Sequence, residues 1–180
     1  MKKIFVFLFS ISTAYFLQAQ TFINYNTLSG KDAGATVSAY INNNSEMSGS
    51  FYLYENWENN ATVLFKNEEV LIKNINFDAL RGKFVSQIST DSVFVFYNLD
   101  KVFILGKTFI NINNKYYQSL DSSNPENGFL KEYYIKEIKP EVHVISNKVL
   151  KPGEKKLMHK YYMYLNNTLT EINLKKKDIL

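Results

Sequence analysis

From Phe51 onward the chain consists of short runs of β-branched and aromatic residues, separated by Asn, Asp and Gly. Runs of this length are too short for most helices, and the residues between them are those that form tight turns. The pattern therefore predicts an all-β fold, an antiparallel meander that forms a sandwich or a partly open barrel. We expect residues 51–180 to form a single β domain, preceded by a loosely structured leader over residues 21–50.

The clearest strands are predicted between residues 92 and 120. The runs 93–96 and 102–105 lack polar alternation, which predicts central strands that are buried on both faces, and truncation of Phe94 or Phe103 to Ala is expected to cost about 3–5 kcal/mol. Residues 109–113 alternate between apolar and polar side chains, Gly106 permits a bulge or sharp bend, and 116–120 follows an Asn-Asn turn. These four runs predict a four-stranded antiparallel meander.

Further strands are predicted on both sides of this meander. Residues 61–65, 70–77 and 83–88 precede it, and 129–138 follows it as a strand rather than a short helix, ending at Pro140. Residues 156–165 and 169–174 bracket Asn166, Asn167 and Thr168, and asparagine readily adopts the positive φ that a tight hairpin turn requires. In the leader, one short strand is expected over residues 36–41.

The two ends of the chain suggest export and an additional helical turn. Residues 1–20 have the organisation of a signal peptide, with Lys2 and Lys3, an apolar run over residues 4–17 and Ala19. The mature chain is therefore expected to begin at Gln20 or Thr21. The alternative is a transmembrane anchor, but the apolar run is shorter than the roughly 20 residues that a helix needs to cross a bilayer. We therefore expect the periplasm, the outer-membrane surface or secretion. Residues 174–180 resemble the start of an amphipathic helix, which favours truncation over an end that folds back onto the sheet.

Composition excludes several kinds of chemistry and partner. The chain has no cysteine, which excludes disulfides, thiolate catalysis, cysteine-ligated zinc and a lipid-anchoring lipobox. The net charge of +4 includes Lys2 and Lys3, so removal of the signal peptide leaves about +2. A bias this small gives no reason to expect nucleic acid as a partner.

Candidates for catalysis or metal binding are few. His143 and His159 lie in different segments, and Glu141 with His143 does not make a recognisable metal site. Carboxylates that fall at predicted turns are explained there by solvation and turn formation: Glu68, Glu69, Asp78, Asp91 and Asp100. The sequence therefore predicts no catalytic residue, cofactor or metal. A pair of acids for glycoside hydrolysis stays open, because the separation of two carboxylates depends on the fold.

Aromatic residues offer the best candidate contact. Trp57 with Tyr52 and Tyr54 could stack against a sugar or contact a partner protein, although outward-facing rings more often form cross-strand pairs. A basic C-terminal part, with Lys155, Lys156, Lys160 and residues 175–177, could meet lipopolysaccharide phosphates or anionic lipid. On alternating strands these lysines are more simply a solvated face.

A resemblance covers residues 49–180. The segments GSFYLYENWENNATVLFKNEEVLIKNINFDALRGKFV, VFILGKTFI, FLKEYYIKEIKP and KYYMYLNNTLTEINLKKKDIL, taken in that order, are similar to a group of uncharacterised, exported, β-rich bacterial proteins. In that group a helical tail follows the Lys-rich run, whereas this sequence ends at Leu180. The resemblance implies an exported β protein and implies no activity.

Two functional classes follow from these patterns. The first is an exported, non-enzymatic binding or structural module of the cell envelope, which would use exposed rings to bind a surface glycan or another envelope protein. The second is a small β-barrel carrier of an apolar ligand. A glycan-directed hydrolase is the third choice. A carrier requires an empty interior, whereas a binding module keeps a filled core.

Overall fold

The computed structural model describes residues 33–38, 47–90, 92–121, 124 and 127–173. Within these ranges all regular structure is β, the pairing is almost entirely antiparallel, no sheet closes into a barrel and no helix is long and apolar enough to cross a membrane. The predicted all-β fold is confirmed. The predicted signal peptide and the predicted C-terminal helical turn lie outside the described residues.

A four-stranded sheet has the order β1-β7-β6-β5. Its strands are β1 (Gly34–Ser38), β5 (Ile75–Asp78), β6 (Lys83–Ser89) and β7 (Ser92–Phe96). Strand β1 overlaps the strand predicted over residues 36–41, begins two residues earlier, and pairs along its whole length with β7. The leader therefore contributes an edge strand to this sheet.

A nine-stranded sheet has the main order β15-β14-β11-β10-β9-β8-β3-β4, and β2 pairs with β14 in parallel. Its strands are β2 (Met47–Ser48), β3 (Ala61–Phe65), β4 (Glu68–Ile72), β8 (Lys101–Ile104), β9 (Lys107–Ile112), β10 (Lys115–Ser119), β11 (Gly128–Ile138), β14 (Gly153–Leu165) and β15 (Thr168–Ile172). The strand predicted over residues 129–138 and the last predicted hairpin are confirmed.

Hairpin turns of two residues set the register of the larger sheet. Asn113 and Asn114, and likewise Asn166 and Asn167, have φ between 49° and 64° at the two central positions. Two successive residues with positive φ characterise the type I′ turn, whose twist matches that of the strands it joins. Leu105 and Gly106, between β8 and β9, also have positive φ, which confirms the sharp bend predicted there.

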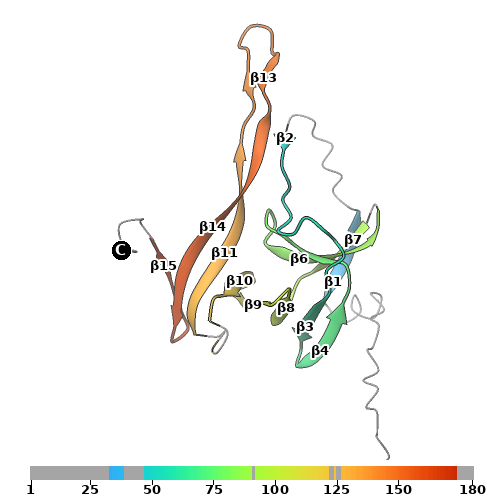
Figure 1. Ribbon diagram of the computed structural model, residues 1–180, viewed down its shortest axis with the longest axis vertical. Coiled ribbons are helices and arrows are strands. Elements are labelled where there is room, and N and C mark those ends of the chain that lie inside the picture. The colour runs from blue at the N-terminus through green and yellow to red at the C-terminus, as the bar shows by residue number, and fades with distance from the viewer. Residues whose placement is uncertain (1–32, 39–46, 91, 122–123, 125–126, 174–180) are drawn as a thin grey trace, which may run out of the picture.

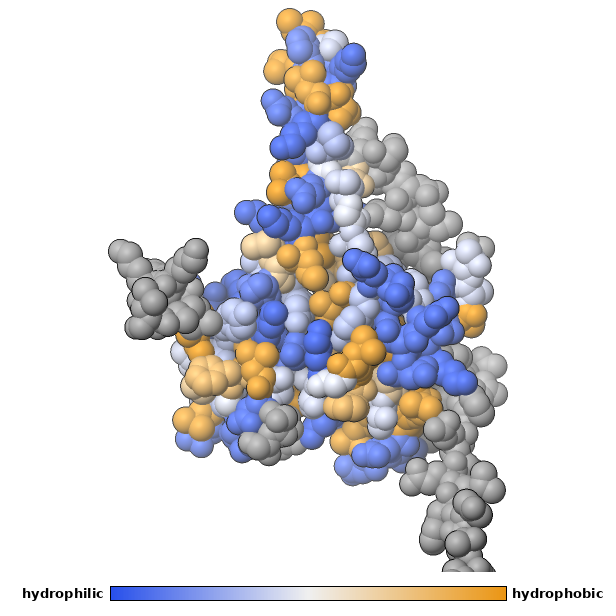
Figure 2. Space-filling model, viewed as in Figure 1, coloured by the Kyte–Doolittle hydropathy of each residue, from blue (hydrophilic) through white to orange (hydrophobic). Residues whose placement is uncertain are grey.

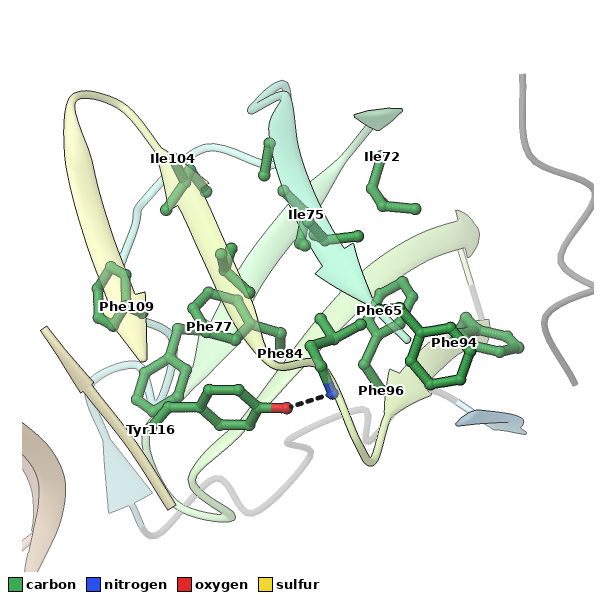
Figure 3. Close-up of a cluster of buried hydrophobic side chains, with 14 of the residues drawn as sticks. Phe65, Ile72, Ile75, Phe77, Phe84, Phe94, Phe96, Ile104, Phe109 and Tyr116 are labelled. Carbon is green, nitrogen blue, oxygen red and sulfur yellow. Dashed lines mark hydrogen bonds between the residues drawn. The ribbon is translucent and has the colours of Figure 1, made fainter. Parts of the chain in front are cut away.

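The two sheets share one core, which is rich in phenylalanine (Figure 3). Phe77 and Phe84 of the smaller sheet meet Phe109 and Tyr116 of the larger one, with ring centroids 5.1–6.5 Å apart. Tilted and edge-to-face rings at these distances attract one another beyond the effect of area burial. The Tyr116 hydroxyl accepts a hydrogen bond of 3.0 Å from the backbone N–H of Leu99. The interior between the sheets is therefore filled with rings.

Two of the predicted strand arrangements are wrong. The predicted strand over residues 70–77 is divided at Asn74, where φ is 52°, so that β4 belongs to the larger sheet and β5 to the smaller one. Strand β7 pairs with β1 and β6, and not with β8 as the predicted four-stranded meander requires. The observed meander runs instead from β8 through β9, β10, β11 and β14 to β15. At Asn74 the chain crosses between sheets within a run that looks like one strand in sequence, and after β7 it crosses at a turn that looks like a hairpin.

The two runs predicted to be buried on both faces behave differently. In β7, Phe94 points into the shared core, and Val93 and Val95 lie on the other face beneath Tyr52 and Trp57. In β8, none of the described residues gives the outer face a comparable cover, and Phe103 is 51% exposed. The prediction of burial on both faces is therefore confirmed for residues 93–96 and wrong for residues 102–105, although both strands are central in their sheets.

Strands β11 and β14 form a hairpin whose far end projects from the body as an arm (Figure 1). We define the arm as residues 136–156, and its tip as residues 141–151, which include β12 (Glu141–Val142) and β13 (Val149–Lys151). Pairing of β11 with β14 ends at Ile138 opposite Glu154, and β12 pairs with β13 beyond Pro140 and Pro152. Proline donates no hydrogen bond to a strand ladder, which explains the interruption.

Strand β2 braces the arm just below its tip. Met47 and Ser48 pair with Gly153 and Glu154, and the Ser48 hydroxyl donates a hydrogen bond of 3.2 Å to the Gly153 carbonyl oxygen. A Cβ atom at position 153 would lie 2.8 Å from the Ile138 carbonyl oxygen and closer still to the Met47 sulfur. Glycine is therefore required for this close approach of three segments. The brace fixes the arm to the chain that leads into the body.

Candidate functional site

The outer face of the larger sheet carries a second apolar cluster, separate from the shared core. Ile110, Tyr117 and Leu130 are buried there, and half-buried side chains surround them: Ile112, Tyr162, Tyr164 and Leu169. They come from β9, β10, β11, β14 and β15, at alternate positions that place them on one face. This face is partly apolar, rich in tyrosine and open to solvent at its margins.

A cavity of about 330 Å³ opens on this face. The apolar part of its lining comes from Leu64, Ile110 and Ile112, and Tyr164 lines it as well. Five polar side chains complete the lining: Asp100, Lys101, Asn111, Asn127 and Asn167. A hollow of this size, with one aromatic ring and several amides and charges, is suited to a small polar ligand that also has an apolar face.

Hydrogen bonds hold several of the polar groups that line the cavity. The Asn111 side-chain amide donates to the Leu99 carbonyl oxygen at 3.0 Å, and Asp100 accepts a bond of 3.0 Å from the backbone N–H of Lys66. The Tyr164 hydroxyl donates to the Asn167 side-chain oxygen at 3.3 Å. Groups held in this way keep their remaining donor and acceptor capacity in a fixed direction.

A polar row lies next to the cavity on the same face. The Tyr162 hydroxyl donates a bond of 2.6 Å to Glu132, and Lys115 donates one of 3.3 Å to the other oxygen of the same carboxylate. Burial, and then the Glu132 carboxylate, raise the pKa of Tyr162. Burial likewise raises the pKa of Tyr117 to about 12. Both phenols therefore stay protonated at neutral pH and remain hydrogen-bond donors.

The three aromatic residues predicted to make contact with a ligand or partner are placed on two different faces of the body. Trp57 and Tyr52 form an edge-to-face pair with centroids 4.7 Å apart and cover Val85, Val93 and Val95. Tyr54 packs instead against the shared core, and in the described part of the chain its buried hydroxyl has no hydrogen-bond partner. Trp57 is half-buried, so its ring serves mainly as a cover for the smaller sheet.

Histidines and acids are dispersed. His143 is exposed in the tip, where its Nδ1 lies 3.1 Å from the Ser146 hydroxyl, and His159 packs against Tyr161 on β14. Burial, and then the nearby Lys131, lower the pKa of His159. The described residues contain no group of three or more His, Asp or Glu that could hold a metal ion.

The solvated role predicted for Asp78 is wrong. Its side chain is fully buried, and the carboxylate accepts bonds from the backbone N–H groups of Leu80 and Arg81 and from the Arg81 guanidinium, each at 3.0–3.1 Å. Burial raises the pKa of Asp78, against the opposing effect of these bonds. The carboxylate closes the turn between β5 and β6 and is not available to a ligand. Asp91 lies outside the described residues.

Comparisons with other proteins give no relative. No family model, curated protein or solved structure is significantly similar to the chain. The class of the protein is therefore given by its fold, an all-β body of two sheets with a projecting arm.

The cavity and the arm were both missed by the sequence analysis. The cavity gathers residues from five separated segments, and no local pattern signals it. The arm does have a signal, because Pro140 and Pro152 are two of the three prolines in the chain and enclose eleven residues. A pair of prolines placed symmetrically about a turn, on either side of two short apolar runs, indicates a hairpin interrupted halfway along its length.

Proposed function

We propose that the protein is an exported, non-enzymatic binding module of the cell envelope, and that it binds a glycan in the cavity on the outer face of the larger sheet. The observation that carries this proposal is the lining of that cavity, which combines Tyr164 and three aliphatic residues with three amides and one carboxylate. Sugars present apolar C–H faces for stacking and hydroxyl groups that pair with amide and carboxylate side chains.

The same lining favours binding over hydrolysis. Glycoside hydrolysis normally uses two carboxyl groups about 5–9.5 Å apart on either side of the bond that is cut. Asp100 is the one carboxylate among the described residues that line the cavity, and no histidine lines it. The arrangement therefore offers hydrogen bonds and a stacking surface, without the acid and base pair that catalysis would need.

The filled interior gives less support to a carrier of an apolar ligand. A carrier would need space between its sheets, whereas Phe77, Phe84 and Phe109 occupy the centre with rings 5.0–5.9 Å apart. Export itself rests on the N-terminal pattern of Lys2, Lys3 and the apolar run that follows.

Titration with a panel of neutral and acidic oligosaccharides, followed by NMR chemical shifts, tests the proposal. We expect shifts at Lys101, Ile112 and Tyr164, and a loss of binding of tenfold or more in Tyr164→Ala. Tyr161→Ala is the matched control, because Tyr161 belongs to the same strand and points to the opposite face. Equal binding by the two variants, or shifts confined to Trp57 and its neighbours, would contradict the proposal.

A further inference from the structure

The tip of the arm exposes aliphatic side chains to an unusual degree. Val144 is 92% exposed and Ile145 is 89% exposed, and Val142, Val149 and Leu150 are exposed as well. Figure 2 shows these hydrophobic residues gathered at the far end of the arm, away from the body. Single exposed aliphatic residues are common, but a contiguous group at the end of a projection marks an interaction site.

The tip is an ordered turn. The His143 backbone N–H donates a bond of 2.8 Å to the Lys148 carbonyl oxygen, and the Asn147 N–H donates one of 2.9 Å to the His143 carbonyl oxygen. Asn147 has a φ of 53°, and the Ser146 hydroxyl lies 3.1 Å from the His143 ring. Val144 and Ile145 are therefore held at the outermost position by the turn itself, with no buried neighbours on the arm.

The arm carries mainly positive charge. Residues 136–156 contain six lysines and three glutamates, a net charge of +3 within a chain whose total is +4. Lys136 and Lys156 lie directly opposite each other on β11 and β14. Lys155 and Lys151 lie opposite Glu137 and Glu141, so the excess positive charge comes from Lys136, Lys139, Lys148 and Lys156, less Glu154. Lys148 stands in the tip turn, and Lys139 and Lys151 follow within roughly 20 Å along the strands.

We infer that the tip docks onto an anionic lipid bilayer, with Val144 and Ile145 inserted among the headgroups and Lys139, Lys148 and Lys151 facing lipid phosphates. Apolar residues at the extreme end with cations behind them match the layers of a membrane surface, in which phosphates lie outside the hydrocarbon. On the arm, Val144 and Ile145 lie outermost, Lys148 lies beside them in the turn, and Lys151 lies nearer the base, opposite Glu141. This inference is independent of the glycan cavity.

A protein partner fits the tip less well. Stable protein interfaces bury about 800 Å² on each side and are enriched in Trp, Tyr and Arg. The tip is only two short strands wide, and its eleven residues include no Trp, Tyr, Phe or Arg. β-branched aliphatic residues and lysines instead suit a fluid surface that requires no fixed complementary shape.

Binding to lipid vesicles tests the inference. The protein is purified from the exported fraction and sedimented with vesicles of phosphatidylcholine alone or with about one third phosphatidylglycerol. We expect binding to the anionic vesicles, weakened by salt, and a loss of roughly tenfold or more in the double variant Val144→Ser, Ile145→Ser. The variant Lys148→Gln, Lys151→Gln should lose several-fold on anionic vesicles.

Matched controls remove the same chemistry from the body. Leu80→Ser with Leu120→Ser removes two exposed aliphatic residues of the body, and Lys73→Gln with Lys107→Gln removes two of its cations. Both should bind vesicles like the unaltered chain. Because every variant has the same N-terminal segment, differences among them report on the substituted residues. Folding is monitored by circular dichroism, and oligosaccharide binding by the tip variants should be unchanged.

A local probe gives a second, independent readout. Trp57 is the single tryptophan, so Trp57→Phe with Ile145→Trp places one fluorophore at the tip. We expect a blue shift of its emission with anionic vesicles and quenching by brominated lipid. The inference is overturned if this emission does not change on vesicle binding, if the tip variants bind like the unaltered chain, or if no binding occurs and a protein protects the tip instead.

Discussion

The body and the arm use the same kinds of apolar residue with opposite outcomes. In β7, Val93 and Val95 are 2% and 5% exposed, whereas Val142 and Val144 in the tip are 47% and 92% exposed. The difference is a covering layer, because Tyr52 and Trp57 lie over β7 and nothing in the described residues lies over the tip. Burial of a β-branched residue is therefore decided by what a distant segment supplies, and not by the strand that carries it.

The largest expected effect on stability comes from comparing a buried phenylalanine with an exposed one. Phe94 is fully buried in the shared core, so Phe94→Ala should lower the free energy of unfolding by about 3–5 kcal/mol. Phe103 is half exposed, and Phe103→Ala should cost about 1 kcal/mol. Urea denaturation measures both. Equal losses would mean that the outer face of β8 is covered in solution.

An intermediate effect is expected where the cover of β7 is removed. Trp57→Ala should lower the free energy of unfolding by about 2 kcal/mol, because the half-buried ring shields Val85, Val93 and Val95. The change would expose the valines on the outer face of β7 to solvent, as the valines of the tip are exposed. Glu58→Ala, an exposed neighbour, serves as the control in thermal denaturation. A neutral Trp57→Ala would show that the ring is a contact residue and not a cover.

A smaller effect, of opposite sign, is expected at Tyr54. Its hydroxyl is buried without a hydrogen-bond partner in the described residues, and such a group costs about 1–3 kcal/mol. Tyr54→Phe should therefore raise the free energy of unfolding by about 1 kcal/mol. Tyr116→Phe is the contrasting variant, because that hydroxyl accepts a bond from Leu99 and its loss should be destabilising. Destabilisation by Tyr54→Phe would indicate that its hydroxyl is bonded in solution.

The smallest effect on stability is expected in the arm. The double variant Val144→Ser, Ile145→Ser should change the free energy of unfolding by less than about 0.5 kcal/mol, because neither side chain packs against the body. Chemical denaturation measures this change directly. A clear loss of stability would mean that the tip folds against another surface in solution and would remove the contrast with the body.

Local signals in the sequence predicted the strands well and their partners poorly. The Asn166 and Asn167 hairpin follows from two adjacent residues, and the structure confirms it with positive φ at both. The division at Asn74 and the transfer of β7 to the smaller sheet depend on contacts with β1 and β6 that no neighbouring residue encodes. A turn residue marks where the chain bends, but not which sheet it then enters.

The candidate sites show the same limit. Trp57 is predicted as a contact residue from the aromatic residues that surround it in sequence, and its packing against Val95 is visible only in the structure. The cavity required Asp100 and Asn167, which are far apart in sequence, to lie at one opening. The apolar residues of the tip look like core residues in the sequence, because the sequence of a strand does not show whether another segment packs over it.

The separation of the tip from the three buried clusters has a consequence for how the protein can evolve. Residues 141–151 contribute no side chain to those clusters, so substitutions there are almost free of a folding cost. Mutational drift is therefore tolerated in the tip and penalised at positions such as Phe84 and Tyr116. Descendants of this chain can change what their arm touches within a few substitutions and still inherit an unaltered body.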